Sequence, residues 1–173
     1  MNTAYIGFGS NIDPEQNIPS AIRMLSRHVN ILAISTIYLT EPLGDADSPQ
    51  FYNGVLKIKT SVQPRQLKFE VLRKIENAHG RTRTRDKYAP RSIDLDIIVY
   101  EDLVVCEPDL VIPDPDIYDR VFIAVPLLEL SPEMILPDTG MRLADIAKTL
   151  HADTMTPLAE FTAALRKEII DEH

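Results

Sequence analysis

The segment "APRSIDLDIIVY" (Ala89–Tyr100) contains the most hydrophobic strand-like run of the chain, and this run carries two carboxylates, Asp94 and Asp96. Side chains alternate along a strand, so the aliphatic residues around the two aspartates point to one face and both carboxylates point to the other. Residues two apart on a strand have Cα atoms roughly 7 Å apart. The run therefore predicts a β-strand that buries one face and presents a pair of negative charges on the other.

Such a carboxylate pair is suited to binding a hard divalent cation. Mg²⁺ prefers oxygen ligands, keeps several waters and takes phosphate oxygens as its remaining ligands. Two such ions, about 3.5–4 Å apart, can clamp a phosphoryl group during in-line displacement. The alternative, from these residues alone, is a solvent-facing edge strand whose charges prevent edge-to-edge association.

A basic segment leads into the strand. "RTRTRDKYAPR" (Arg81–Arg91) holds five basic residues and one acid, in a chain whose net charge is −8. Its alternating basic residues are Arg81, Arg83, Arg85 and Lys87. In an extended loop all four side chains would point the same way and could bind a polyphosphate, since proteins commonly bind polyphosphates through metal ions and arginine side chains. A solvated charge run has the same pattern, and Tyr88 can pack on a purine or simply on the sheet.

Length and composition favour one globular domain, residues 1–173, with 45% hydrophobic and 25% charged residues. No apolar run of about 18 residues is present, so no membrane span is expected. The N-terminus shows no secretory signal, and the single cysteine, Cys106, excludes an internal disulfide, so we expect a cytoplasmic protein. The net charge of −8 argues against general nucleic-acid binding.

The periodicity along the chain predicts a βαββαβ order. Strands are expected at 3–9, 31–40, 52–61 and 93–99, and helices from Asp13 onward, from Pro64 to Gly80, at 121–130, at 141–150 and at 155–170. A hairpin is expected across "YEDL" (100–103), where the Asp-bearing strand ends. This order predicts an α+β, ferredoxin-like antiparallel sheet with helices packed on one face. A helical C-terminal extension is expected at about 141–173.

The central motif resembles the signature of the 6-hydroxymethyl-7,8-dihydropterin pyrophosphokinase family. "YAPRSIDLDIIVY" matches its small residue, proline, arginine, two further residues, Asp-x-Asp and aliphatic residues. Similar stretches follow the family's order along the chain, so the resemblance implies a family-like core at about 3–140. They are "AYIGFGSN" near the start, "LTEPLG" at 39–44, "FYNGVLKIKT" at 51–60, "IENAHGRTRTRDKYAPR" at 75–91 and "DRVFIAVPLLELSPEMILPD" at 119–138.

The resemblance implies transfer of the β,γ-diphosphate of ATP to the hydroxymethyl group of the pterin, with release of AMP, in folate biosynthesis. Catalytic residues by this resemblance are Arg81, Arg91, Asp94 and Asp96, and the two aspartates would also bind two Mg²⁺ ions. ATP, the co-substrate, would contact Arg83, Lys87, Tyr88, Arg91, Ile97 and Arg120. The pterin pocket would consist of Thr40, Pro42, Leu43, Phe51, Asn53 and Phe122. Two phenylalanines can stack on the ring, and an asparagine offers both a donor and an acceptor.

Some positions depart from the family's pattern. Asp114 stands where the family generally has histidine near the ATP phosphates, and Lys87 replaces a frequent arginine. We expect an active enzyme with weaker nucleotide binding and no dedicated histidine base; His79, near a helix end, is expected to interact with the helix dipole. A catalytically impaired nucleotide- or pterin-binding module is the first alternative, and an RNA-contacting module is the second. The expected partners are small molecules, with neither nucleic acid nor membrane, and the chain is expected to be a monomer or a weak homodimer.

Overall fold

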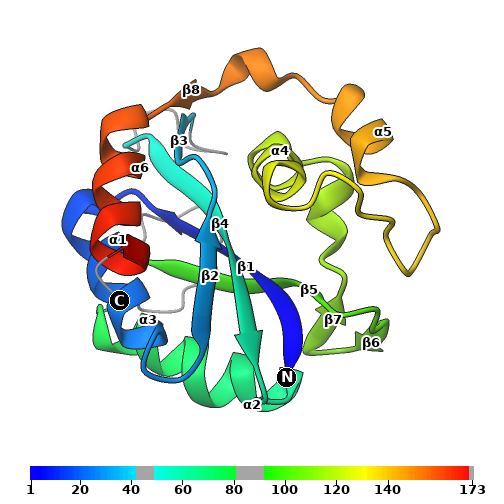
Figure 1. Ribbon diagram of the computed structural model, residues 1–173, viewed down its shortest axis with the longest axis horizontal. Coiled ribbons are helices and arrows are strands. Elements are labelled where there is room, and N and C mark those ends of the chain that lie inside the picture. Colours follow the sequence, from blue (N-terminus) through cyan, green and yellow to red (C-terminus); the bar gives the residue numbers. More distant parts are fainter. Residues whose placement is uncertain (42–48, 81–91, 172–173) are drawn as a thin grey trace.

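The computed structural model describes residues 1–41, 49–80 and 92–171, and its centre is an antiparallel sheet (Figure 1). The sheet strands are β1 (Asn2–Ser10), β2 (Asn30–Ile34), β3 (Tyr38–Thr40), β4 (Phe51–Thr60), β5 (Asp94–Tyr100) and β8 (Thr156–Pro157). Their order is β5-β1-β4-β3-β8, and β2 also pairs with β4. A separate two-stranded sheet contains β6 (Val105–Glu107) and β7 (Leu110–Ile112).

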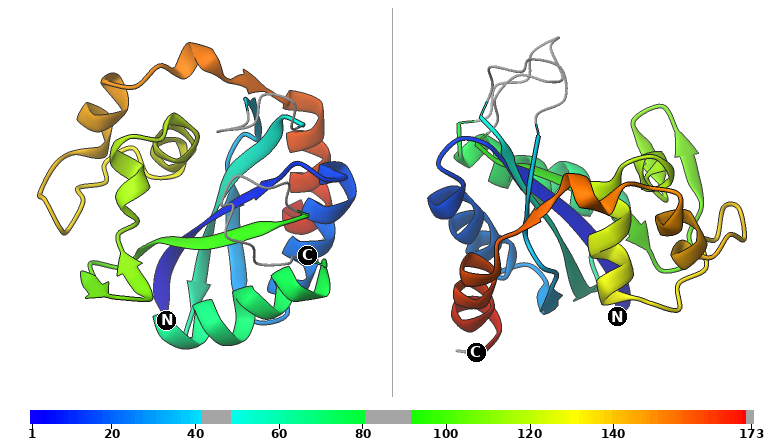
Figure 2. Two further views of the ribbon diagram at one scale, coloured as in Figure 1. Left: turned by 180° about the vertical axis from the view of Figure 1, so that it is seen from behind. Right: turned by 90° about the horizontal axis from the view of Figure 1, so that it is seen from above.

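Helices cover both faces of the sheet. One face carries α1 (Pro14–Leu25), α6 (Ala159–Arg166) with its π-helical continuation (Lys167–Asp171), and a continuous helix over 64–78. That helix consists of α2 (Pro64–Gln66), a π-helical segment (Leu67–Leu72) and α3 (Arg73–Ala78). The other face carries α4 (Val121–Leu130) and α5 (Leu143–Lys148), as the two views in Figure 2 show. The predicted antiparallel sheet with packed helices is confirmed, whereas the expectation of helices on one face only is wrong.

The alternation of side chains along β1 separates these two cores. Ala4, Ile6 and Phe8 join the larger core beneath α1 and the 64–78 helix. Tyr5 points to the other face and joins the smaller core beneath α4 and α5. Apolar side chains on both faces explain why the central strands are nearly continuous hydrophobic runs.

The predicted continuous strand at 31–40 is wrong, because the structure interrupts it between β2 and β3. At the break, the backbone N–H of Thr36 donates to Glu129 Oε2 at 2.7 Å, and that of Ile37 donates to Thr162 Oγ1 at 2.9 Å. Side chains from α4 and α6 thus replace strand partners at this point.

Three local predictions also need correction. The first helix, expected from Asp13 onward, begins at Pro14, because Asp13 has a φ of 42° and makes no side-chain capping hydrogen bond. The hairpin is not across 100–103, because β6 pairs with β7 through the turn at Pro108 and Asp109. The helix expected at 155–170 begins only at Ala159, because the residues before it pair with β3 as β8.

The segment after 140 crosses one edge of the molecule. It passes from α5 on one face, through a short 3-10 turn (Ala152–Thr154) and β8, to α6 on the other face (Figures 1 and 2). Leu165 and Ile169 of its last helical part are buried in the larger core. No helix among the described residues is long and apolar enough to cross a membrane.

Candidate active site

The two aspartates of β5 point to the α4 side of the sheet, as the alternation predicted. Both line a pocket of about 230 Å³. The other lining residues come from β1, β3, β4, β5, α4 and the residues that follow β3 or precede α4. They are Gly7, Phe8, Gly9, Thr40, Glu41, Phe51, Asn53, Gly54, Ile98, Asp114, Asp116, Arg120, Phe122 and Ile123. The pocket therefore brings together residues predicted for metal, ATP and pterin binding.

The floor of the pocket depends on glycines of β1. A Cβ atom on Gly9 would lie 2.5 Å from Asn53 Oδ1, which is closer than real Cβ contacts allow. A Cβ atom on Gly7 would lie 2.9 Å from Ile98 Cδ1. These two glycines let side chains from β4 and β5 lie over the backbone of β1 and face the pocket.

Four of the predicted pterin-binding residues, Thr40, Phe51, Asn53 and Phe122, line this pocket. Asn53 Nδ2 donates a hydrogen bond of 2.7 Å to Thr40 Oγ1, which joins β4 to β3 and orients the amide. The remaining two predicted residues, Pro42 and Leu43, lie outside the described residues. The surrounding walls thus combine flat apolar rings with an oriented amide, as the recognition of a flat heterocycle requires.

Negative charge dominates the pocket. Asp114 and Asp116 accompany the aspartate pair, and Arg120 is the one cationic residue among the described lining residues. The Asp96 side chain faces the pocket, and desolvation together with the neighbouring charges of Asp94, Asp114 and Glu76 raises its pKa to about 8. Burial likewise raises the pKa of Asp114 to about 6, against the lowering effect of a hydrogen bond from the Asp116 backbone. The site is short of positive charge.

This charge distribution fits a divalent cation that shares its ligands with a substrate. Among the described ranges, no group of three or more histidine, cysteine or carboxylate residues is arranged to hold a metal by itself. Asp94 and Asp96 supply two hard oxygen ligands, and Mg²⁺ commonly completes such a set with water and phosphate oxygens. The residues present therefore fit Mg²⁺ bound together with a polyphosphate.

A buried glutamate supports the aspartate pair from behind. Glu76 of α3 is only 2% exposed, and its Oε2 accepts a hydrogen bond of 3.1 Å from the backbone N–H of Leu95. Leu95 lies between the two aspartates, so Glu76 fixes the strand at the point that carries them. The sequence reasoning missed this residue, although an acid next to the buried Ile75 is an informative signal.

A second hollow, of about 460 Å³, adjoins the first pocket along the edge of β5. Asp96 and Asp114 line both, so the two spaces meet at the carboxylates. The further residues of the second hollow are Lys68, Arg73, Ile97, Pro108, Asp109, Leu110, Val111 and Pro115. Ile97, which was predicted to contact ATP, lines this hollow and is otherwise buried in the core. The sequence reasoning missed Lys68 and Arg73, whose spacing on the 64–78 helix was a possible signal.

Arg73 is the most distinctive group of the second hollow. Its guanidinium lies over the ring of Phe69, with the central carbon 4.4 Å from the ring centroid. Its Nε is buried and has no hydrogen-bond partner among the described residues. A buried donor without a partner is costly, so this group is suited to meeting an acceptor from a ligand.

The remaining predicted residues are distributed as follows. Arg120 lines the first pocket, and its Nε lies 4.0 Å from Asp119 Oδ1, at the limit of an ion pair. The predicted residues of the basic segment, Arg81, Arg83, Lys87, Tyr88 and Arg91, lie outside the described residues. His79 is 2.7 Å from the Ile75 carbonyl through Nδ1 and 2.9 Å from Ser20 Oγ through Nε2. Both ring nitrogens of His79 therefore have partners away from the pocket.

An antiparallel sheet with packed helices, whose aspartate pair lies in a pocket beside aromatic rings and an oriented amide, is typical of a protein that binds small-molecule substrates. A family model described as "7,8-dihydro-6-hydroxymethylpterin-pyrophosphokinase (HPPK)" matches residues 5–132. The chain belongs to this family.

Relatives support this assignment. The 2-amino-4-hydroxy-6-hydroxymethyldihydropteridine pyrophosphokinase of Haemophilus influenzae is 37% identical over 142 residues, covering 80% of this chain and 88% of that protein. The protein of the same name from Bacillus subtilis is 40% identical over 132 residues, covering 75% and 78%. The Folic acid synthesis protein fol1 of Schizosaccharomyces pombe is 41% identical over 161 residues, covering 91% of this chain but 22% of that protein.

A solved structure shows the same fold. The crystal structure of Plasmodium falciparum HPPK-DHPS wild type with SDX-DHP is similar with a TM-score of 0.68 and 16% identity. The similarity covers 86% of this chain and 43% of the Plasmodium chain, so this chain spans less than half of that protein.

Proposed function

We propose that this protein transfers the β,γ-diphosphate of ATP to the hydroxymethyl group of 6-hydroxymethyl-7,8-dihydropterin and releases AMP, as a step of folate biosynthesis. The observation that carries the proposal is the Asp94–Asp96 pair, which lines the first pocket and whose Asp96 also lines the second hollow. Membership of the family and the names of the relatives support the same activity.

The two substrates would occupy the two hollows. The pterin would lie in the first pocket, where Phe51 and Phe122 can stack on its ring and Asn53 can bind its amide edge. The nucleoside of ATP would lie in the second, where the Lys68 ammonium and Arg73 Nε, which has no partner in the described part of the chain, can meet its acceptors. The polyphosphate would then pass beside Asp96 and Asp114, which line both hollows, and approach the pterin hydroxyl.

The predicted ligands of Mg²⁺ are Asp94 and Asp96, with two ions expected. When bound, Mg²⁺ would neutralise phosphate charge and so stabilise the transition state. Arg120, and the predicted Arg81, Arg83, Lys87 and Arg91, would add positive charge around the same phosphates.

In the proposed reaction the hydroxymethyl oxygen forms a bond to the β-phosphorus of ATP. The bond between that phosphorus and the oxygen bridging to the α-phosphate breaks, AMP leaves with that oxygen, and the hydroxyl loses its proton. The protein would hold the two reacting groups in line and balance their charge, and this accounts for most of the catalysis of phosphoryl transfer. Because both nitrogens of His79 are engaged elsewhere, no histidine base is assigned.

We also propose that the sheet is ferredoxin-like and that residues 1–173 form one domain. The strand order β5-β1-β4-β2, with α1 and the 64–78 helix on one face, supports the first point. The expected cytoplasmic location and the monomer or weak homodimer remain predictions from the sequence.

The decisive experiment measures AMP release from ATP and Mg²⁺ with and without 6-hydroxymethyl-7,8-dihydropterin. The wild type should release AMP only with the pterin, and Asp96→Ala should lose at least about 10²-fold in rate because the metal site is lost. Asp102→Ala is the matched control, since Asp102 is an exposed acid just beyond the same strand and outside the pocket. A folded wild type that releases no pterin-dependent AMP would overturn the proposal.

A further inference from the structure

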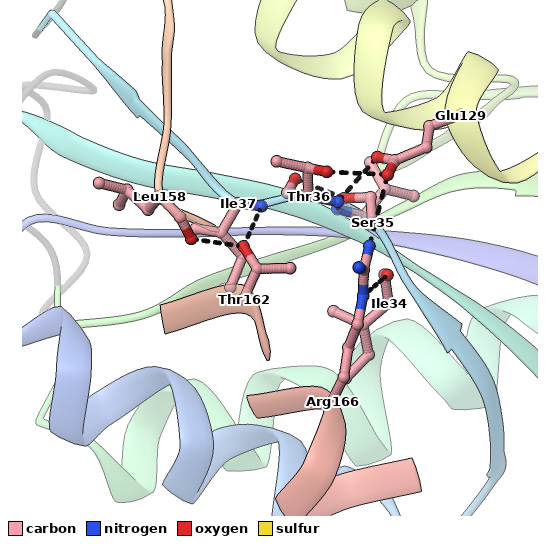
Figure 3. Close-up of polar contacts among 9 residues, drawn as sticks. Ile34, Ser35, Thr36, Ile37, Glu129, Leu158, Thr162 and Arg166 are labelled. Carbon is pink, nitrogen blue, oxygen red and sulfur yellow. Dashed lines mark hydrogen bonds and ion pairs between the residues drawn. The ribbon is translucent and has the colours of Figure 1, made fainter. Parts of the chain in front are cut away.

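We propose that Glu129 and Arg166 form a positioning pair that fixes the distance between the two walls of the first pocket (Figure 3). Glu129 lies in α4, and Arg166 ends α6, beyond the residues 5–132 that match the family model. The inference rests on the proposed function only for the identity of the pocket's ligand.

Both side chains of the pair make hydrogen bonds to the chain at the break between β2 and β3. Glu129 accepts from the Thr36 backbone N–H at 2.7 Å through Oε2 and from the Thr36 hydroxyl at 2.8 Å through Oε1. Arg166 donates from Nη2 to Glu129 Oε1 at 3.3 Å and from Nε to the Ile34 carbonyl at 2.9 Å. One carboxylate and one guanidinium therefore satisfy backbone groups for which the sheet provides no strand partner.

A second contact of α6 lies one turn earlier, on the same side of the helix. Thr162 Oγ1 accepts from the Ile37 N–H at 2.9 Å and donates to the Leu158 carbonyl at 2.7 Å. The Leu158 N–H in turn donates to the Ile37 carbonyl at 2.8 Å. Thr162 and Arg166 are four residues apart, so one face of α6 bonds the chain on both sides of Thr36.

The break is connected to the pocket by two routes, one through β3 and one through α4. β3 begins at Tyr38, next to the break, and its Thr40 accepts the hydrogen bond from Asn53 in the first pocket. Glu129 is two turns along α4 from Phe122, which also lines the first pocket. Since Glu129 and Arg166 join α4, α6 and the start of β3, they determine how far Phe122 lies from Asn53.

A second ion pair provides a matched control. Arg23 of α1 pairs with Glu168 of the π-helical continuation, so it also ties the segment after 140 to the family-matched part. Neither residue lines the first pocket, and among the described residues no hydrogen bond joins either side chain to Ser35–Ile37. Its loss should weaken the attachment of the segment without moving the pocket walls.

The experiment compares Arg166→Ala with Arg23→Ala in the full chain, measuring kcat and the KM values for 6-hydroxymethyl-7,8-dihydropterin and for ATP. We expect Arg166→Ala to raise the pterin KM about three- to tenfold, with the ATP KM unchanged, because coupling through such a network is modest. Arg166→Lys, which keeps the charge, should recover part of this loss, and Arg23→Ala should leave both KM values at the wild-type level. Equal KM values for Arg166→Ala and Arg23→Ala would overturn the inference.

Glu129→Gln keeps an acceptor for Thr36 but removes the charge that attracts Arg166, so it tests the pair if Arg166→Ala fails to fold. It should raise the pterin KM less than Arg166→Ala, and the double variant should add little to the larger single effect, since both changes break one pair. Fully additive effects would contradict a shared role. Calorimetric titration with the pterin separates this outcome from a failure of the proposed reaction, because binding can be measured in a protein that forms no AMP.

Discussion

At the scale of single residues, Asp114 has a structural role that its place in the family pattern does not reveal. Its Oδ1 accepts a hydrogen bond of 2.9 Å from the Asp116 N–H and so caps the 3-10 turn at Pro115–Tyr118. The same carboxylate lies where both hollows meet, beside the expected path of the polyphosphate. Asp114 thus stabilises a turn while adding negative charge to an already acidic site.

Replacing Asp114 by asparagine should separate these two roles. Asparagine caps as well as aspartate, so the turn should persist, while loss of the charge should lower the KM for ATP about three- to tenfold. Steady-state kinetics at saturating pterin measure this, with thermal unfolding as the check on stability. Asp114→Ala, which also loses the cap, should in addition cost about 1 kcal/mol of stability. A higher KM for ATP in Asp114→Asn would instead mean that the carboxylate helps to hold the cation.

The raised pKa of Asp96 predicts that the stability of the metal-free protein depends on pH. Its pKa is about 8 in the folded chain and 3.8 ordinarily, so between these values the folded state keeps a proton that the unfolded state has lost. The free energy of unfolding should therefore fall as pH rises from about 4 to about 8, and Asp114 adds the same sign up to about pH 6. Urea titrations in EDTA at pH 5, 6.5 and 8 measure this, and Asp96→Asn should remove the decline above pH 6.5. Added Mg²⁺ should also flatten it, and an unchanged slope in Asp96→Asn would refute the assignment.

At the scale of elements, the strand pair β1–β4 carries two close approaches on opposite faces. A Cβ on Gly9 would meet Asn53 Oδ1 at 2.5 Å in the pocket, whereas a Cβ on Gly54 would meet the Phe8 ring at 2.4 Å in the core. Gly9→Ala should therefore displace the amide and raise the pterin KM about tenfold or more, with little loss of stability. Gly54→Ala should instead destabilise the fold by about 1–3 kcal/mol through overpacking. Kinetics and chemical denaturation of both variants test this contrast, and similar profiles would contradict it.

The elements that the sequence predicted well are those whose signal is local. β1, β4, β5 and the 64–78 helix each carry their own periodicity, and α4 forms despite Pro126. The break between β2 and β3 depends on Glu129 and Thr162, which are 93 and 125 residues away from their partners. The pattern of residues along 31–40 therefore gives no indication that the strand is interrupted. The two-residue strand β8 likewise exists only because the edge of β3 is available to it.

At the scale of the whole molecule, the site also divides into residues that a local sequence pattern predicts and residues that depend on distant partners. The strand pattern located the aspartate pair and the resemblance implied its role, and the described residues bring the pair together with Asn53 and Phe122 in one pocket. Glu76 and Arg73 were missed because their roles depend on how the 64–78 helix packs against β5, which no local pattern encodes. A strand motif can predict the chemistry of its own side chains, whereas the residues that support it come from tertiary packing.

The segment after 140 should fold as part of the same cooperative unit as the family-like core. Leu165 is 1% exposed and lies in the larger core cluster, so Leu165→Ala should cost about 2–5 kcal/mol. Leu103→Ala is the matched control, because Leu103 is 39% exposed and should cost less than about 0.5 kcal/mol. Urea unfolding followed by far-UV circular dichroism and by tyrosine fluorescence should give one coincident transition in each protein. An early transition confined to Leu165→Ala, with the rest of the unfolding curve unchanged, would show instead that the segment is a separate unit on an independently stable core.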